Sequence, residues 1–191
     1  LEVVQNVDGP AYVRMLRGEV PRLFPKDEPL VFSKPRVLSE DGDILILSTG
    51  ICTEEVMRAR TALHKRGVST AHLHVSTLKP FDSTTIVEAI GSARRGVITI
   101  ENHSIIGGLG SATAERMAEM GASVKLVRFG LQDRYAHGAS RPYLMHEYGL
   151  DASAVVSGVE TLIGEKLEIS ADELARAPIR TSTDGAKAED L

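Results

Sequence analysis

The sequence predicts an α/β domain of three layers, in which a mainly parallel sheet is flanked by helices. The first observation is the continuous apolar run at residues 43–48, which is typical of a strand covered on both faces. The second is the alternation of such runs with helix-like segments between residues 42 and 167. Repeated strand–helix–strand units imply right-handed crossovers, so neighbouring strands should run parallel.

Strands and helices alternate in order along this region. The first helix should begin at Thr53, an N-cap candidate, and stop at Gly67. The second should open at Ser83 or Thr84, and the third follows a glycine-rich turn. The expected strands are 43–48, 69–75, 96–101 and 124–129, and two further helices are expected at 143–148 and 152–167.

The flanks of this region differ from it in composition. Residues 11–16 form a strand-like run that has no neighbour in sequence to pair with. Residues 21–41 read as a linker because four prolines interrupt them, and proline neither donates to a ladder nor continues a helix. Residues 168–191 form a tail rich in Ala, Asp, Glu and Lys, for which the sequence indicates no role.

Composition excludes several classes of protein. With 191 residues, 42% of them hydrophobic and 25% charged, the chain can bury a core, which excludes wholesale disorder. A net charge of −4 and the absence of Trp argue against nucleic acid as a partner. Cys52 is the single cysteine, so neither a disulfide framework nor a cysteine zinc cluster can form within the chain. Without a long apolar run or a signal-peptide pattern, we expect a cytoplasmic protein with no membrane contact.

The glycine-rich turn at residues 102–112 is the first candidate site. Backbone amides at the start of the following helix could hold an anion. The dinucleotide fingerprint is not met, because the sixth position counted from Gly108 is Thr113, and no Walker A sequence is present. The three glycines Gly107, Gly108 and Gly110 therefore favour a tight turn with close backbone packing over a phosphate site.

Two pairs of polar residues are candidates for chemistry. His72 and His74 share one side of a strand and could bind a metal, but without acidic or cysteine companions we favour buried or rim histidines and predict no metal site. Glu101 and His103 end a strand at the carboxyl edge, where open α/β sheets place ligands. A catalytic pair is one interpretation, and a pair that lines an interface or anchors the loop is the favoured one.

Two further groups favour structural roles. Ser48, Thr49 and Thr53 follow the first strand of the sheet and indicate helix capping, and Cys52 among them has no activating base in sequence. Asp133, Arg134 and His137 are expected in a solvated loop. The residues alone therefore predict a parallel α/β domain without a complete active site.

Several motifs together resemble the transketolase family. Residues 101–112 (ENHSIIGGLGSA) look like the signature of its C-terminal domain, and 130–134 and 147–150 look like that domain's closing section. Residues 9–21 resemble the end of its pyrimidine-binding domain. The resemblance covers about residues 9–167 and extends to deoxyxylulose-phosphate synthase and to the β subunit of pyruvate-type dehydrogenases.

The resemblance implies an organisation in four parts. Residues 1–20 would end a preceding pyrimidine-binding domain, 21–41 would be a proline-rich linker, 42–167 the transketolase C-terminal domain, and 168–191 a tail. The unpaired strand at 11–16 would then be the last strand of the preceding domain.

The resemblance also implies an activity for the complete enzyme. It would move a two-carbon ketol unit between sugar phosphates with thiamine diphosphate and Mg²⁺, which other domains hold. This chain would bind neither, would carry no catalytic residue, and would support dimer assembly. The alternatives are the synthase, a 2-oxoacid dehydrogenase β subunit, or a non-catalytic interaction module.

The expected partners follow from the missing domains. They are the thiamine-diphosphate-binding and pyrimidine-binding domains, on the same or a separate chain, a sugar phosphate, and a second copy of this chain. Self-association is expected through the surface around the glycine turn. Arg17 matches the family's sugar-phosphate-binding arginine, because it lies between Gly9-Pro10 and Pro21 as that residue does. The alternative is that Arg17 is a surface residue of the linker.

Overall fold

A single mixed sheet organises the chain in the computed structural model, which describes residues 2–13, 20–25 and 28–179. Its strand order is β1-β3-β2-β4-β5. Strands β2, β3, β4 and β5 run parallel, and β1 is antiparallel to β3. The strands are β1 (Arg36–Ser39), β2 (Ile44–Ser48), β3 (Thr70–His74), β4 (Gly96–Ser104) and β5 (Leu126–Leu131).

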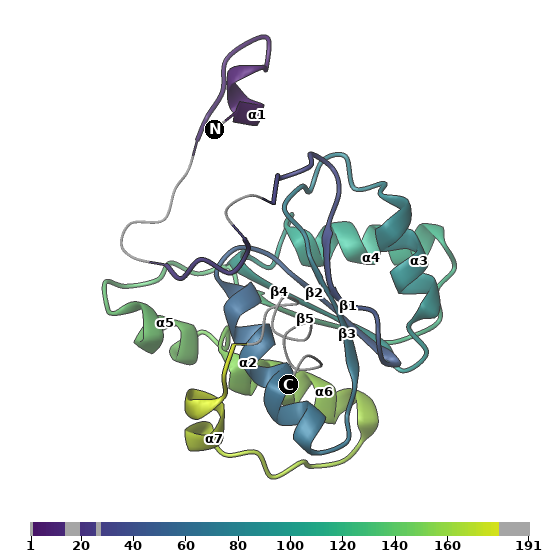
Figure 1. Cartoon of the computed structure of the whole chain (residues 1–191), viewed down its shortest axis with the longest axis vertical. Helices are drawn as coiled ribbons and strands as arrows, with labels where there is room; N and C mark the ends of the chain where they lie inside the picture. The colour runs from purple at the N-terminus through teal and green to yellow at the C-terminus, as the bar shows by residue number, and fades with distance from the viewer. Residues whose placement is uncertain (1, 14–19, 26–27, 180–191) are drawn as a thin grey trace, which may run out of the picture.

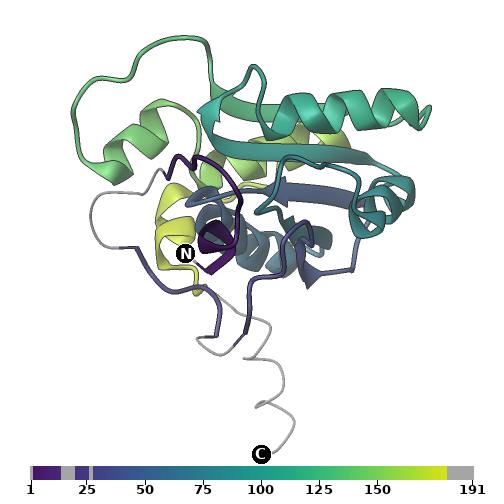
Figure 2. The same ribbon diagram turned by 90° about the horizontal axis from the view of Figure 1, so that it is seen from above.

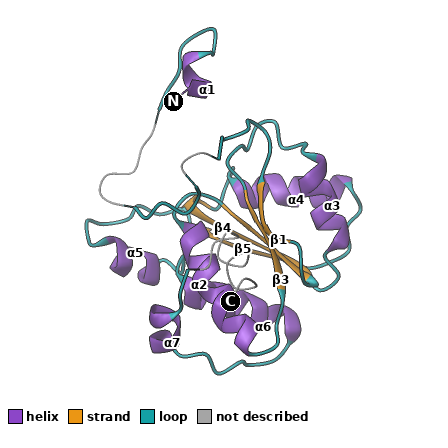
Figure 3. Ribbon diagram, viewed as in Figure 1, coloured by secondary structure: helices purple, strands orange, loops and turns teal. Residues whose placement is uncertain are grey.

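Helices cover both faces of this sheet, as Figures 1 and 3 show. The helices are α1 (Glu2–Gln5), α2 (Cys52–Lys65), α3 (Thr84–Ser92), α4 (Leu109–Glu119), α5 (Arg141–Glu147), α6 (Ala152–Ile163) and α7 (Ala171–Arg176). Alternate residues of β2 enter opposite cores: Ile44 and Ile46 pack with α2 and α6, whereas Leu45 and Leu47 pack with α3 and α4. The three-layer α/β fold predicted from the sequence is therefore confirmed.

Several predicted boundaries shift by a few residues, such as those of β4, β5 and α5, and two of the shifts have a clear physical cause. Helix α6 ends at Ile163 rather than at residue 167, because Gly164 adopts the left-handed conformation that stops a helix. Thr53 is not the N-cap of α2, since the helix begins at Cys52 and Ile51 occupies the cap position without a side-chain hydrogen bond. The hydroxyl of Thr53 has other partners, described below.

Strand β1 was not predicted, and it lies inside the proline-rich stretch 21–41. It pairs with the outer side of β3, where Arg36 is opposite His74. Edge strands tolerate neighbouring prolines because only one side of the strand needs hydrogen-bond donors. Residues 11–13 of the expected strand 11–16 belong to no strand here, and residues 14–16 lie outside the described part of the chain.

Helix α7 makes the beginning of the tail part of the folded domain. Leu174 and Ala177 are buried, and Leu174 joins the core under α2 and α6. Arg66, the C-cap residue of α2, pairs with Glu173 at 2.8 Å, and the Thr61 hydroxyl donates to the carbonyl of Pro178 at 3.0 Å. Residues after 179 lie outside the described part. Among the helices of that part, none is long and apolar enough to cross a membrane.

Replacing Leu174 with alanine tests whether α7 belongs to the cooperative unit. The change should lower the free energy of unfolding by about 2–5 kcal/mol, because it leaves a cavity between α7 and α2. Urea unfolding of Leu174→Ala and of the matched control Arg176→Ala, whose side chain is exposed, measures the difference. Equal midpoints for the two variants would show that α7 does not stabilise the domain.

Candidate functional site

The glycine turn is organised by the buried carboxylate of Glu101, which is 1% exposed. Its Oε2 accepts a hydrogen bond from the backbone N–H of Leu109 at 2.7 Å, and its Oε1 accepts one from Gly110 at 2.8 Å. These N–H groups belong to the first turn of α4, where helix donors have no partner inside the helix. The positive end of the helix dipole stabilises the carboxylate there. Strand β4 and helix α4 are thus joined by one side chain.

At each glycine of the turn, the structure shows why a larger residue is disfavoured. A Cβ at Gly108 would lie 1.9 Å from Oε2 of Glu101, and one at Gly110 would lie 2.9 Å from Cδ of Arg128. Gly107 has a φ of 75°, a conformation that residues with a side chain rarely adopt. A larger residue at Gly108 would displace the Glu101 carboxylate, so such a substitution perturbs folding as well as the surface.

Because Glu101 occupies the start of α4, the structure distinguishes phosphate binding from close packing as the role of the turn. An anion at α4 would have to compete with the protein's own carboxylate for the amides of Leu109 and Gly110. The N–H of Gly107 is also used, because it donates to the Ser111 hydroxyl at 2.9 Å. The geometry therefore supports packing, and it does not support phosphate binding by these groups.

Glu101 and His103 have different surroundings. Both oxygens of Glu101 accept bonds from the turn, whereas His103 is exposed and its Nδ1 lies 3.0 Å from the carbonyl oxygen of Ser104. Beyond His103, Ile106 presents an apolar side chain that is 62% exposed at the tip of the turn. The contacts of Glu101 are those of a residue that holds a loop, because each of its buried oxygens accepts a backbone N–H from the start of α4.

A second polar cluster lies between the sheet and α2 and includes both strand histidines. The Ser48 hydroxyl is 2.8 Å from Nε2 of His72 and 2.9 Å from the Thr53 hydroxyl. The Thr53 hydroxyl is in turn 2.7 Å from Nδ1 of His74. The sequence predicted helix capping for these hydroxyls; they instead connect two imidazole rings, because Thr53 lies inside α2 and points at β3.

Both imidazoles are held in the neutral form. Burial, and to a smaller extent the Arg36 guanidinium, lowers the pKa of His74 to about 4. Burial, followed by the charges of Arg60 and His74, lowers the pKa of His72 well below its usual value. Within the described ranges, no group of three or more His, Cys, Asp or Glu residues could hold a metal ion.

The linker packs on this cluster. The Phe24 ring lies 5.1 Å from the His74 ring, and the Arg36 guanidinium lies 4.2 Å from the centre of the Phe24 ring. Arg36 also donates to the carbonyl of Glu28 at 3.0 Å. The linker therefore reaches the sheet at the carboxyl end of β3. Arg17, the predicted phosphate-binding residue, lies outside the described residues.

Two residues of α2, the buried Cys52 and the partly exposed Glu55, complete the region. Burial raises the pKa of the Cys52 thiol, and Glu55 and Glu101 add to the effect, so Cys52 is an unreactive core residue. Sequence reasoning missed Glu55, whose Oε2 accepts from the backbone N–H of Ala152 at 3.0 Å and caps the start of α6. No local signal could reveal this contact, since the two residues are 97 positions apart.

The loop after β5 is exposed at Asp133, Arg134 and His137, which confirms the predicted solvated loop, and it also contacts neighbouring rings. The Arg134 guanidinium lies 5.4 Å from the centre of the Tyr148 ring, and His137 contacts the rings of Tyr143 and Tyr148. These contacts tie the loop to α5. Tyr135, between them, is fully exposed.

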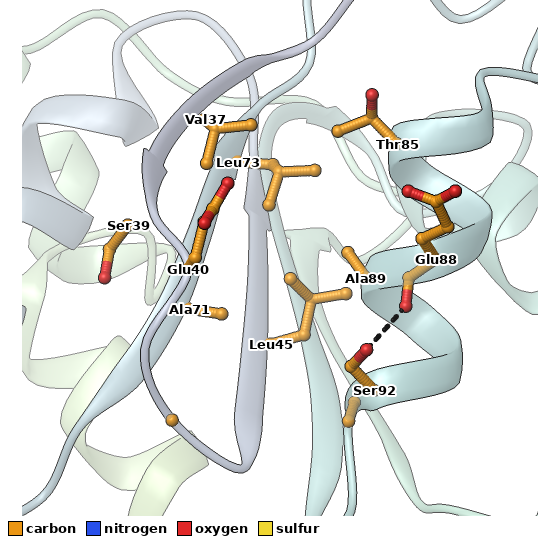
Figure 4. A pocket seen from close by; sticks show the side chains of 12 residues that line it. Val37, Ser39, Glu40, Leu45, Ala71, Leu73, Thr85, Glu88, Ala89 and Ser92 are labelled. Carbon is orange, nitrogen blue, oxygen red and sulfur yellow. Dashed lines mark hydrogen bonds between the residues drawn. The ribbon is translucent and has the colours of Figure 1, made fainter.

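A groove of about 260 Å³ opens on the other face of the sheet, between β1 and α3. Its floor is apolar and includes Leu45 and Leu73, and the carboxylates of Glu40 and Glu88 stand apart on opposite walls (Figure 4). The Ser92 hydroxyl in its wall donates to the carbonyl of Glu88 at 2.9 Å. The groove thus contains no convergent set of polar groups.

Fold and site together define an α/β domain in which a buried carboxylate, Glu101, occupies the start of α4. A model of the transketolase C-terminal domain matches residues 33–155. The chain belongs to the transketolase family, in which it corresponds to that C-terminal domain.

Relatives and a solved structure agree with this assignment. A putative transketolase C-terminal section of Methanocaldococcus jannaschii is 33% identical over 83% of this chain and 50% of the relative. A 6-deoxy-6-sulfo-D-fructose transketolase subunit of Clostridium sp. (strain MSTE9) is 35% identical over 83% of this chain and 49% of the relative. The structure of a split-gene transketolase, an inactive β4 tetramer, matches with a TM-score of 0.68 and 33% identity over 77% of this chain and 47% of that one.

The matches cover only part of each relative, and the relatives include two kinds of enzyme. This chain spans about half the length of these transketolase relatives. Several 1-deoxy-D-xylulose-5-phosphate synthases are also similar, and they match over about a quarter of their length.

The family uses thiamine diphosphate and Mg²⁺, and the described residues do not fit either group. The amides at the start of α4 that might hold a diphosphate are bonded to Glu101. The described part also lacks a cluster of three candidate metal ligands. No step of the family's chemistry can be assigned to these residues.

The neutral histidines predict a pH dependence of stability. The pKa of His74 is about 4 in the folded chain and about 6.5 in the unfolded chain. Above pH 6.5 both states are neutral, whereas below it the unfolded state binds the proton and the folded state does not. Stability should therefore fall between pH 6.5 and 4, by about 3 kcal/mol at most for His74.

Urea unfolding of the wild type and of His74→Asn between pH 7.5 and 4 measures this effect. The variant should lose less stability across the range, and the exposed control His103→Asn should behave as the wild type does. The comparison isolates His74 because Glu55, whose pKa burial raises and whose effect on stability is opposite in sign, is present in every protein. Identical pH profiles for the wild type and His74→Asn would contradict the account.

Proposed function

We propose that this chain is the C-terminal part of a thiamine-diphosphate-dependent transketolase, which transfers a two-carbon ketol unit between sugar phosphates. The observation that carries the proposal is its match, over about half their length, to a transketolase C-terminal section and a transketolase subunit. The filled helix start at Glu101 supports a role in assembly, with the chemistry on other domains.

The complete enzyme would bind thiamine diphosphate and Mg²⁺ on domains that precede this one. In this proposal residues 1–20 end the pyrimidine-binding domain, 21–41 link the two domains, 42–167 form the C-terminal domain and 168–191 the tail. The thiamine-diphosphate-binding and pyrimidine-binding domains lie on the same or a separate chain. The cofactor, when bound, supplies the electron sink for cleavage of the sugar carbon–carbon bond.

Self-association is the second part of the proposal. The surface around Gly107, Gly108 and Ile106 would meet a second copy, because the turn exposes an apolar side chain on a rigid base. A similar chain has been solved as a β4 tetramer, which supports this expectation. We propose a cytoplasmic location for the assembled enzyme.

Arg17 is the one residue of this chain that we propose for substrate binding. A guanidinium presents a planar set of donors that matches the oxygens of a phosphate group. The position between Gly9-Pro10 and Pro21, which matches that of the family's phosphate-binding arginine, supports this role. The sugar itself is left open, because the matched transketolase subunits are named for different sugars.

The test is a kinetic assay of the complete enzyme with the preceding domains present. Transfer of a two-carbon unit that requires thiamine diphosphate and Mg²⁺ is the expected result. Release of 1-deoxy-D-xylulose 5-phosphate without such transfer would favour the alternative function, a deoxyxylulose-phosphate synthase. The similarity of this chain to such synthases supports that alternative. No cofactor-dependent reaction of either kind would contradict the proposal.

The same assay examines Arg17 with Arg17→Ala and Arg17→Lys. Loss of one charge-assisted hydrogen bond costs about 1.5–3 kcal/mol, or roughly 10- to 150-fold in binding. KM for phosphorylated sugars should rise by that factor with a smaller change in kcat, and Arg17→Lys should recover part of it. Equal losses with phosphorylated and unphosphorylated acceptors would contradict the assignment.

A further inference from the structure

The loop after β5 and helix α5 together carry an unusual concentration of aromatic and cationic side chains. Three of the four tyrosines of the chain lie between residues 135 and 148. We define the tyrosine surface as Arg134, Tyr135, His137, Tyr143 and Tyr148. Tyrosine and arginine are among the residues enriched at the energetic centres of protein interfaces, because they combine a large contact area with polar groups.

The residues on both sides of Tyr135 in sequence anchor its loop, while its ring projects into solvent. On one side Arg134 stacks on Tyr148 at 5.4 Å, and on the other side His137 contacts Tyr143 and Tyr148 with ring centres 5.9 and 6.4 Å apart. Tyr135 itself is fully exposed, and Tyr143 is 54% exposed. A tyrosine side chain has only two χ angles to fix on binding, so its entropic cost per contact area is low.

The position of this surface indicates what covers it. The loop leaves the carboxyl end of β5, and the linker enters opposite the carboxyl end of β3, where Arg36 pairs with His74. Both therefore lie at the same edge of the sheet, and Figures 1 and 2 show them on one side of the molecule. Strands β1 and β5 are four strand spacings apart, or about 19 Å.

A domain joined to the linker can cover that distance. In the relative of which 161 residues match 50%, a similar length remains unmatched. A domain of that length has a radius of gyration of about 15 Å, so its diameter exceeds the span from the linker to the loop. The length of chain outside this domain and the point where the linker enters thus both indicate that the preceding domain covers the tyrosine surface.

We propose that the tyrosine surface packs against the domain that precedes this one in the complete protein, with Tyr135 at the centre of the contact. This inference rests on the proposed function, which supplies the preceding domain. The ring of Tyr135 contributes nothing to the packing of the domain described here, so its role is in that interface.

Hydroxyl-radical footprinting of the complete protein, read by mass spectrometry, tests the proposal. Tyr135 should oxidise about tenfold more slowly, or slower still, than in a free peptide of residues 131–140, since each 1.4 kcal/mol of interface free energy lowers the open fraction tenfold. Oxidation at the rate of the peptide would overturn the proposal.

Two variants separate the interface from other causes of protection. Tyr135→Ala should speed the oxidation of Tyr143 on the same surface, and the control Arg176→Ala, on the exposed side of α7, should leave that rate unchanged. Protection that weakens on dilution would identify a second copy as the occupant and overturn the proposal. An unchanged Tyr143 rate in Tyr135→Ala would do the same.

The two-carbon transfer assay on the same preparations keeps this inference distinct from the proposed function. An active enzyme with an unprotected Tyr135 counts against the tyrosine surface alone. A protected Tyr135 in a protein that transfers no two-carbon unit counts against the proposed function and leaves the interface in place.

Discussion

The rest of the carboxyl edge depends on one buried charge, the Glu101 carboxylate. Removing a carboxylate from water is costly, and Glu101 recovers the cost through two backbone N–H groups and the positive end of α4. This geometry requires glycine at residue 108, and it fixes the turn between β4 and α4. The end of β4 then pairs with the end of β5 through the N–H of Ile105 and the carbonyl of Leu131, so the next loop is positioned as well.

The same constraint agrees with the role in assembly that we propose for this domain. In many α/β proteins the amides at a helix start bind a phosphate. Here the chain's own side chain occupies them, and the neighbouring histidines are neutral and bonded to hydroxyls. What remains at this edge is a set of ordered loops with exposed side chains, Ile106 on one and Tyr135 on the next. Such surfaces suit contacts with other domains and copies.

The sequence predicted the central fold because strands buried on both faces produce continuous apolar runs, such as 43–48. It did not predict β1, because four residues beside prolines show no clear alternation of apolar and polar side chains. It also did not predict α7, although Ser170 caps that helix by accepting from the N–H of Glu173. The glycines and Glu101 were identified as a group, but the contact between Glu101 and α4 needed the folded geometry. The role given to Thr53 was wrong, since capping and a buried hydroxyl bridge to His74 have the same sequence signal.

Amide hydrogen exchange at Leu109 and Gly110 tests the central claim most directly. If Glu101 holds the start of α4, both amides exchange slowly in the wild type. They should exchange about tenfold faster or more in Glu101→Gln, which loses a charge-assisted bond of about 1.5–3 kcal/mol, while core amides of β2 change less. Slow exchange at both amides that is unaffected by Glu101→Gln, with the fold intact, would contradict the account.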